Sequence, residues 1–242
     1  MRTRAVLFDL GSTLVSYYRA DEFPNILRRC LRACLAELKP ATGTEPDEEL
    51  FNLALSLNHE AADHAVRPLA ERLGTLFPEH RHDMRVVERL STAFLKPIFA
   101  TACLDPDAIP VLEALRAQGH CLAIVSNTPW GSAAIDWRDE LNRHGLLAAV
   151  DAAVFCVEVG FRKPHPAPFR RALEALDVSA RAALFVGDDA RWDVLGAHAA
   201  GLRPLLVAPT APGEAPFGGV PVVHHLRDVL KHVAPADQQA GN

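Results

Sequence analysis

The chain has 242 residues, of which 49% are hydrophobic and 23% are charged, and this balance excludes disordered and fibrous classes of protein. Its 25 basic and 30 acidic residues give a formal net charge of −5, and the absence of a Lys/Arg run argues against a nucleic-acid partner. No window approaches the ~20 consecutive apolar residues that a bilayer requires, so we expect no membrane span.

The chain opens with a short apolar segment that ends on a carboxylate. The segment "RAVLFDL" predicts a first strand over residues 4–10, with Asp9 at its carboxyl end. It lacks the long apolar stretch and small-residue cleavage site of a signal peptide. Gly11 follows in the turn.

Helical periodicity then dominates the region from about residue 16 to residue 100. The pattern predicts helices over 22–38, 47–65, 67–76 and 84–99. Cys30 and Cys34 lie one turn apart on an apolar stripe, which favours buried packing for both. The five scattered cysteines contain no CxxC pair, so we expect a cytoplasmic protein.

From Asp105 onward, helices and strands alternate in the way that is typical of parallel strands with crossover helices. Strands are predicted over 121–127, 151–157, 182–189 and 203–208, and helices over 106–119, 132–145, 167–178 and 191–201. A loop at 210–219, a last short strand and helix within 221–233, and a disordered tail at 234–242 complete the prediction.

Polar side chains stand where several of these apolar runs end. Three separate apolar runs end on Asp9, on Ser126 with Asn127, and on Asp188 with Asp189. Because ligands of open α/β sheets bind beyond the carboxyl ends of the strands, we expect these groups to converge on one site. Two carboxylates there suit a hard cation such as Mg²⁺. Lys163, in the loop "VGFRKPHPAPF", would suit an anionic ligand.

Four segments, in order, resemble the motifs of the haloacid dehalogenase-like hydrolase superfamily: "LFDLGSTL", "LAIVSN", "GFRKPHPAPF" and "VGDDARWDVLGAHAAG". The resemblance implies an α/β fold with a Rossmann-like parallel sheet flanked by helices, and an all-helical cap. We expect the core to comprise residues 1–15 and 101–242, and the cap domain to comprise residues 16–100. The implied activity is a magnesium-dependent phosphatase acting on a small phosphorylated metabolite.

The resemblance also implies a role for each matching residue. Asp9 is the expected nucleophile, which forms an aspartyl-phosphate. Ser126 and Lys163 are expected to assist catalysis and, together with Asn127, to bind the phosphate. The implied magnesium ligands are Asp9, the backbone carbonyl of Gly11, Asp188 and, as an outer or water-bridged ligand, Asp193.

Gly11 departs from the family pattern, which has a second aspartate at this position. Glycine keeps the backbone carbonyl for the metal but loses the carboxylate that acts as general acid and base, a role worth ~100- to 10,000-fold. We therefore expect a preference for phosphates whose leaving groups are already stable as anions. A substitute acid could be water or one of the downstream side chains Ser12, Tyr17, Tyr18, Asp21 and Glu22.

Several alternatives remain open at this point. The chain could be a 2-haloacid dehalogenase-type hydrolase, or a catalytically degenerate member that binds a phosphorylated ligand or a partner protein. Asp189 is interpreted as a helix N-cap rather than a metal ligand. Trp130 could line the pocket mouth or pack in the core. We expect a monomer or a homodimer.

Overall fold

The centre of the molecule is a parallel sheet, seen in a computed structural model that describes residues 3–38, 45–58, 62–208 and 219–234. In this part of the chain the sheet has six strands in the order β5-β4-β1-β6-β7-β8, and every neighbouring pair is parallel. The strands are β1 (Ala5–Phe8), β4 (Cys121–Ser126), β5 (Ala152–Phe155), β6 (Ala183–Gly187), β7 (Arg203–Val207) and β8 (Val222–Val223). The predicted α/β fold class is confirmed.

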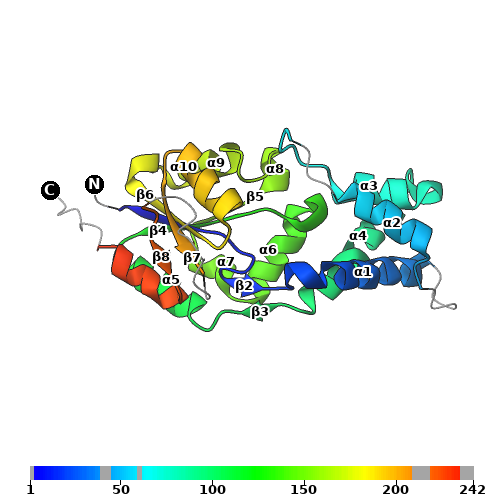
Figure 1. Ribbon diagram of the computed structural model, residues 1–242, viewed down its shortest axis with the longest axis horizontal. Helices are drawn as coiled ribbons and strands as arrows, with labels where there is room; N and C mark the ends of the chain where they lie inside the picture. The colour runs from blue at the N-terminus through cyan, green and yellow to red at the C-terminus, as the bar shows by residue number, and fades with distance from the viewer. Residues whose placement is uncertain (1–2, 39–44, 59–61, 209–218, 235–242) are drawn as a thin grey trace.

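Helices cover both faces of this sheet (Figure 1). They are α5 (Ala108–Ala117), α6 (Ala134–Arg143), α7 (Leu146–Ala149), α8 (Cys156–Val159), α9 (Ala167–Leu176) and α10 (Gly196–Ala199). Alternate residues of β1 serve the two faces, because successive strand side chains point to opposite sides. Val6 and Phe8 join the apolar cluster that contains α5, whereas Ala5 and Leu7 join the cluster that contains α9 and α10. Burial on both faces explains why β1 reads as a continuous apolar run.

Between β2 and β3, the described residues form four α-helices in a block that extends away from the sheet (Figure 1). They are α1 (Phe23–Leu38), α2 (Glu48–Leu57), α3 (Leu69–Leu76) and α4 (Met84–Phe99). Asp47 and Asp83 cap α2 and α4 by accepting hydrogen bonds from backbone N–H groups. Cys30 and Cys34 are 1% and 0% exposed in α1, which confirms their packing role. The cap-domain boundaries remain a prediction.

The second predicted helix, over 47–65, is too long. α2 ends at Leu57, residues 59–61 are outside the described part, and Ala65 forms an antiparallel bridge with Phe161. The bridge requires extended backbone and therefore excludes a helix at Ala65. A short antiparallel pair, β2 (Val15–Ser16) with β3 (Cys103–Leu104), was not predicted.

Other departures are local. The strand predicted over 151–157 ends at Phe155, and the helix predicted over 191–201 begins as the π-helix η5 (Ala190–Leu195) before α10. The 3₁₀ turns are η1 (Ala20–Glu22), η2 (Pro78–His80), η3 (Pro129–Gly131), η4 (Ala180–Ala182) and η6 (Leu226–His232). The loop predicted at 210–219 and the tail predicted at 234–242 lie, except for Gly219 and Ala234, outside the described residues.

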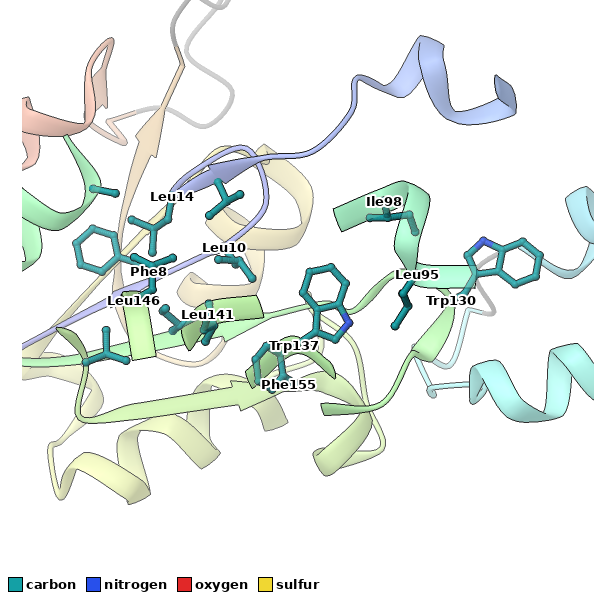
Figure 2. Packing of buried hydrophobic residues seen from close by; sticks show 14 of the residues in the cluster. Phe8, Leu10, Leu14, Leu95, Ile98, Trp130, Trp137, Leu141, Leu146 and Phe155 are labelled. Carbon is teal, nitrogen blue, oxygen red and sulfur yellow. The ribbon is translucent and has the colours of Figure 1, made fainter. Parts of the chain in front are cut away.

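Trp130 packs in the interior, on the side of the helical block. It is 2% exposed, and its ring centroid lies 5.1 Å from that of Phe94. Figure 2 shows Trp130 toward the helical block, while Trp137 lies nearer Phe155. Of the two interpretations of Trp130, core packing is confirmed. No described helix is long and apolar enough to cross a bilayer.

Candidate active site

A cavity of about 220 Å³ lies at the carboxyl ends of β1, β4 and β6. The sheet brings these ends together because β1 pairs in parallel with both β4 and β6. Every residue that the sequence predicted for the site lines this cavity: Asp9, Gly11, Ser126, Asn127, Lys163, Asp188 and Asp193. The expected convergence of the strand tips is therefore present, although lining a cavity does not assign a role.

Lys163 joins two of the carboxylates. Its Nζ donates to Asp9 Oδ1 at 2.5 Å and to Asp193 Oδ1 at 2.7 Å, and its side chain is 2% exposed. Burial alone would lower the pKa of Lys163, but the attraction of Asp193 and Asp9 outweighs it and raises the pKa. The ammonium is therefore charged at neutral pH and fixed in one position.

Three carboxylates gather at this point. One oxygen from each of Asp9, Asp188 and Asp193 lies within 4.8 Å of the others. Burial, reinforced by repulsion from Asp9, raises the pKa of Asp188 to about 8. Burial likewise raises the pKa of Asp193 to about 7, against the lowering effect of Lys163. Fully ionised, the cluster holds more negative charge than one ammonium balances, and oxygen ligands of this kind fit a divalent cation such as Mg²⁺.

Thr13 bridges two of these carboxylates and was missed as a site residue. Its Oγ1 lies 3.4 Å from both Asp9 Oδ2 and Asp188 Oδ1, and the residue is 3% exposed. The available signal was its place in "LFDLGSTL", four residues after Asp9. The hydroxyl has a single hydrogen, so it can donate to only one of these carboxylates at a time.

Asn127 holds the backbone that carries Lys163. Its Oδ1 accepts from Lys163 N at 2.8 Å, and its Nδ2 donates to Lys163 O at 3.1 Å. This paired contact links the end of β4 to the lysine loop. Ser126, which is 4% exposed, precedes it at the tip of β4.

Asp189 caps η5, as the sequence predicted. Its Oδ1 accepts from the backbone N–H groups of Arg191 and Trp192, both at 2.7 Å. The backbone N–H of Asp189 donates in turn to Asp193 Oδ2 at 3.1 Å. Asp189 therefore caps η5 through its side chain and helps to fix Asp193 near the carboxyl end of β6 through its backbone N–H.

Gly11 stands beside open space. A Cβ placed on it would meet no heavy atom within 4 Å, and its φ is not in the left-handed region. Among the suggested substitutes for the missing acid, Ser12, Tyr17 and Tyr18 line the cavity. Asp21 is exposed in an ion pair with Arg19, and Glu22 accepts from the Arg19 backbone, so neither faces the site.

Two aromatic residues of the cavity wall have buried polar atoms without a partner. Among the described residues, neither Tyr17 Oη nor Trp192 Nε1 has a hydrogen-bond partner. Burial, with a smaller contribution from Glu140, raises the pKa of Tyr17 far above its usual value. The phenol therefore keeps its proton at any working pH. Its ring packs edge-on against Trp137, with centroids 5.5 Å apart.

Comparison with known proteins yields consistent matches. A family model described as haloacid dehalogenase-like hydrolase matches residues 3–201. A glyceraldehyde 3-phosphate phosphatase of Methanopyrus kandleri is 31% identical over 82% of this chain and 81% of that protein. A phosphoglycolate phosphatase of Cereibacter sphaeroides is 31% identical over 94% of this chain and 98% of that protein. A solved 2-haloacid dehalogenase from Pseudomonas syringae is 26% identical, with a TM-score of 0.69, and covers 95% of this chain and 97% of its own.

Proposed function

This chain belongs to the haloacid dehalogenase-like hydrolases, and we propose that it is a magnesium-dependent phosphatase of a small phosphorylated metabolite, with Asp9 as the nucleophile. The family predicted from the motifs is confirmed. The observation that carries the proposal is the contact of Lys163 Nζ with both Asp9 and Asp193 at the end of β1. A buried ammonium there stabilises the nucleophilic carboxylate and the phosphoryl group beside it.

In the proposed reaction an Asp9 carboxylate oxygen forms a bond to phosphorus while the bond from phosphorus to the ester oxygen breaks. Water then attacks the aspartyl-phosphate, and phosphate leaves with Asp9 restored. Ser126 and Lys163 contact the phosphoryl oxygens, and Asn127 holds Lys163 in place through the lysine backbone. The leaving oxygen must gain a proton, and because glycine at position 11 has no carboxyl to supply it, the proton comes from water.

The residues that would hold magnesium are Asp9, the carbonyl of Gly11, Asp188 and, through water, Asp193. Their donor set fits the ion because the oxygens cluster and their negative charge exceeds that of Lys163. When bound, Mg²⁺ neutralises charge on the transferring phosphoryl group. Asp193 also anchors Lys163, so its position depends on the ion pair as well as on the metal.

Helices α1–α4 are proposed to form the cap domain over residues 16–100, which covers the cavity and selects the substrate. The similar phosphatases from Methanopyrus kandleri and Cereibacter sphaeroides are named for glyceraldehyde 3-phosphate and phosphoglycolate. Both compounds are small phosphate esters, which supports this substrate class here. They differ at the end away from the phosphate, where only phosphoglycolate has a carboxylate.

The structural likeness to a 2-haloacid dehalogenase makes that activity the second candidate. A displacement of halide by an aspartate needs no cation, whereas the clustered carboxylates Asp9, Asp188 and Asp193 are repulsive without one. This repulsion favours the phosphatase. Chloride release from 2-chloropropionate in the absence of metal would favour the dehalogenase instead.

The test is a phosphatase panel of p-nitrophenyl phosphate, acetyl phosphate and sugar phosphates, assayed with Mg²⁺ and with chelator. We expect metal-dependent turnover in the native protein and none in Asp9→Asn. Turnover that persists in Asp9→Asn would refute the assigned nucleophile. Binding of phosphate esters without any turnover would instead support a degenerate, ligand-binding protein.

A further inference from the structure

The helical block meets the core at a place other than the β2–β3 pair. Val66 N donates to Gly160 O at 2.9 Å. Arg162 N donates in return to His64 O at 2.8 Å, and the two bonds flank the antiparallel bridge between these segments. Residues 64–66, here named the docking segment, lead toward α3, and Figure 1 shows this part of the chain reaching toward α8. Backbone pairing therefore joins the block to the core.

The core side of this pairing is the stretch that carries Lys163. Arg162, which donates to the docking segment, is the residue directly before Lys163. On the other side, Asn127 accepts from Lys163 N at 2.8 Å and donates to Lys163 O at 3.1 Å. The side chain of the lysine bonds Asp9 and Asp193. The lysine loop is thus fixed by the helical block at one end and by the tip of β4 at the other.

A second core loop packs against the same part of the helical block. Trp130 lies in η3, the turn that follows β4, and its ring centroid is 5.1 Å from that of Phe94 in α4. The Arg72 guanidinium of α3 lies 5.4 Å from the Trp130 ring centroid. Gly131 is so close to the Arg67 carbonyl that a Cβ on it would lie 2.3 Å from the carbonyl oxygen. Both loops that carry proposed phosphate-binding residues therefore contact the block.

We propose that residues 64–66 are a positioning element, whose docking on the core holds the Lys163 loop, so that covering of the cavity and placement of the ammonium occur together. The inference rests on the proposed function for the role of Lys163, and it gives the helical block a part in the chemistry besides covering the cavity. Each backbone bond at the edge of a loop raises the free energy of opening that loop locally. Loss of the pairing should release the lysine loop and leave the sheet folded.

Val66→Pro tests the pairing, because it removes the N–H group that donates to Gly160 O. The preceding residue, Ala65, takes part in the bridge and is therefore extended, which is the conformation that a following proline favours. Val66→Ala is the matched control, since it shortens the side chain and keeps the N–H group. A difference between the two variants reports the hydrogen bond rather than the side chain.

Gly131→Ala tests the docking in a second way, because it separates the two surfaces without removing a hydrogen bond. The new Cβ would overlap the Arg67 carbonyl oxygen. Gly145→Ala is its control, because Gly145 also has positive φ, +73° against +67°, but the nearest atom to its Cβ would be Ile109 Cδ1 at 4.0 Å. The two alanines carry similar backbone strain, so a difference between them reports displacement of the helical block.

Reductive methylation followed by peptide mass spectrometry measures whether Lys163 is released. The Lys163 side chain is 2% exposed, and Lys231, whose side chain is 77% exposed, is the internal standard. The ratio of labelling rates, Lys163 over Lys231, should rise by about 10-fold or more in the undocking variants Val66→Pro and Gly131→Ala. It should keep its native value in the two controls. Labelling is done at a temperature at which melting curves show each variant to be folded.

Hydrolysis of p-nitrophenyl phosphate connects release of the lysine to the chemistry. We expect kcat to fall by about 10- to 100-fold in the undocking variants, because a misplaced ammonium stabilises the phosphoryl charge less, and to be unchanged in the controls. The inference is overturned if Lys163 labels no faster in either undocking variant than in its control, or if it labels faster while kcat is unchanged. A native protein without any hydrolysis would contradict the proposed function, whereas the labelling ratios would still decide whether docking holds Lys163.

Discussion

Lys163 and Asp9 are separated by 154 positions in the sequence, yet the lysine Nζ lies 2.5 Å from Asp9 Oδ1. The sheet explains the contact, because Asp9 follows β1 and Asn127, which follows the neighbouring β4, holds the Lys163 backbone. Asp193 is the second acceptor, 2.7 Å from the same ammonium. One buried ion cluster therefore joins the end of β1 to the lysine loop and to η5, and the proposed chemistry uses the same groups.

Removal of the Lys163 charge should destabilise the protein. Lys163→Met retains an unbranched side chain but leaves two buried carboxylates without their cation, a change that typically costs about 3–5 kcal/mol. Urea unfolding in the presence of chelator measures the difference in free energy. The double variant Lys163→Met/Asp193→Asn should recover part of this loss, since it also removes one of the unpaired charges. Strictly additive effects, or a Lys163→Met protein as stable as the native one, would show that the ion pair contributes little.

Gly11→Asp should increase the rate for substrates with poor leaving groups. The position has room for a Cβ and has no left-handed backbone, so an aspartate can be accommodated without strain. A new carboxyl could protonate the leaving oxygen, and we expect kcat for alkyl phosphates to rise by about 100-fold or more. For acetyl phosphate, whose leaving group needs no proton, the rate of Asp9 phosphorylation should change little, and the gain should be confined to hydrolysis of the aspartyl-phosphate.

Gly11→Asn is the control for Gly11→Asp, because it has the same shape and cannot exchange a proton at neutral pH. Steady-state assays of both variants on an alkyl and an acyl phosphate separate proton transfer from changes in shape. An equal gain in the two variants, or no gain in either, would contradict the assignment of position 11 as the missing acid and base.

Asp188→Asn should stabilise the metal-free protein and abolish its response to magnesium. Burial and the neighbouring carboxylates raise the folded-state pKa of Asp188 to about 8, above its unfolded value of about 4. The folded state therefore binds this proton more tightly, and metal-free stability should increase as the pH falls from about 8 toward 4.

At pH 8.5 most of the Asp188 carboxyl is ionised, so Asp188→Asn should raise the free energy of unfolding by about 1–2 kcal/mol in chelator. In saturating Mg²⁺ the native protein should be more stable than Asp188→Asn, because only the native protein has the Asp188 carboxylate with which to bind the ion. Thermal melts at pH 6 and pH 8.5, with and without metal, measure both effects. A native protein that gains no stability from Mg²⁺ would refute the proposed ligand set.

A comparison of Gly131→Ala with Gly160→Ala separates the cost of backbone strain from the cost of steric overlap near the lysine loop. Both have positive φ, +67° and +80°, so alanine should cost about 1 kcal/mol at each. A Cβ on Gly131 would also lie 2.3 Å from the carbonyl oxygen of Arg67, whereas one on Gly160 would meet nothing within 4 Å. Gly131→Ala should therefore be the more destabilising by about 1–3 kcal/mol in denaturant titrations. Equal losses would mean that the Arg67 segment moves away at little cost.

The elements that bury continuous apolar runs were predictable from the sequence. Strands β1, β4 and β6 occur where expected because each combines a buried apolar run with a polar tip, and the alternation of strands and helices fixes parallel pairing. The two-residue pair β2–β3 has no periodicity to detect. The extended backbone at Ala65, inside the predicted helix, pairs with Phe161 in a bridge that no local pattern encodes.

The sequence predicted only those residues of the candidate site that occupy recognisable motif positions. Asp9, Lys163 and Asp188 carry charge at strand ends or in a motif loop, so their convergence could be inferred. Thr13 could not be assigned, because its importance lies in its neighbours: its hydroxyl lies near the carboxylates of both Asp9 and Asp188. Such contacts form only in the tertiary structure, so they leave no local pattern in the sequence.

The most direct test of the account is whether Asp9 becomes phosphorylated. The native protein, incubated with acetyl phosphate and Mg²⁺ and analysed by intact-mass and peptide mass spectrometry, should gain one phosphoryl group at Asp9. The adduct should accumulate because Gly11 cannot activate the hydrolytic water, and it should be absent from Asp9→Asn. A native protein that shows neither adduct nor turnover, or an adduct that persists in Asp9→Asn, would contradict Asp9 as the nucleophile.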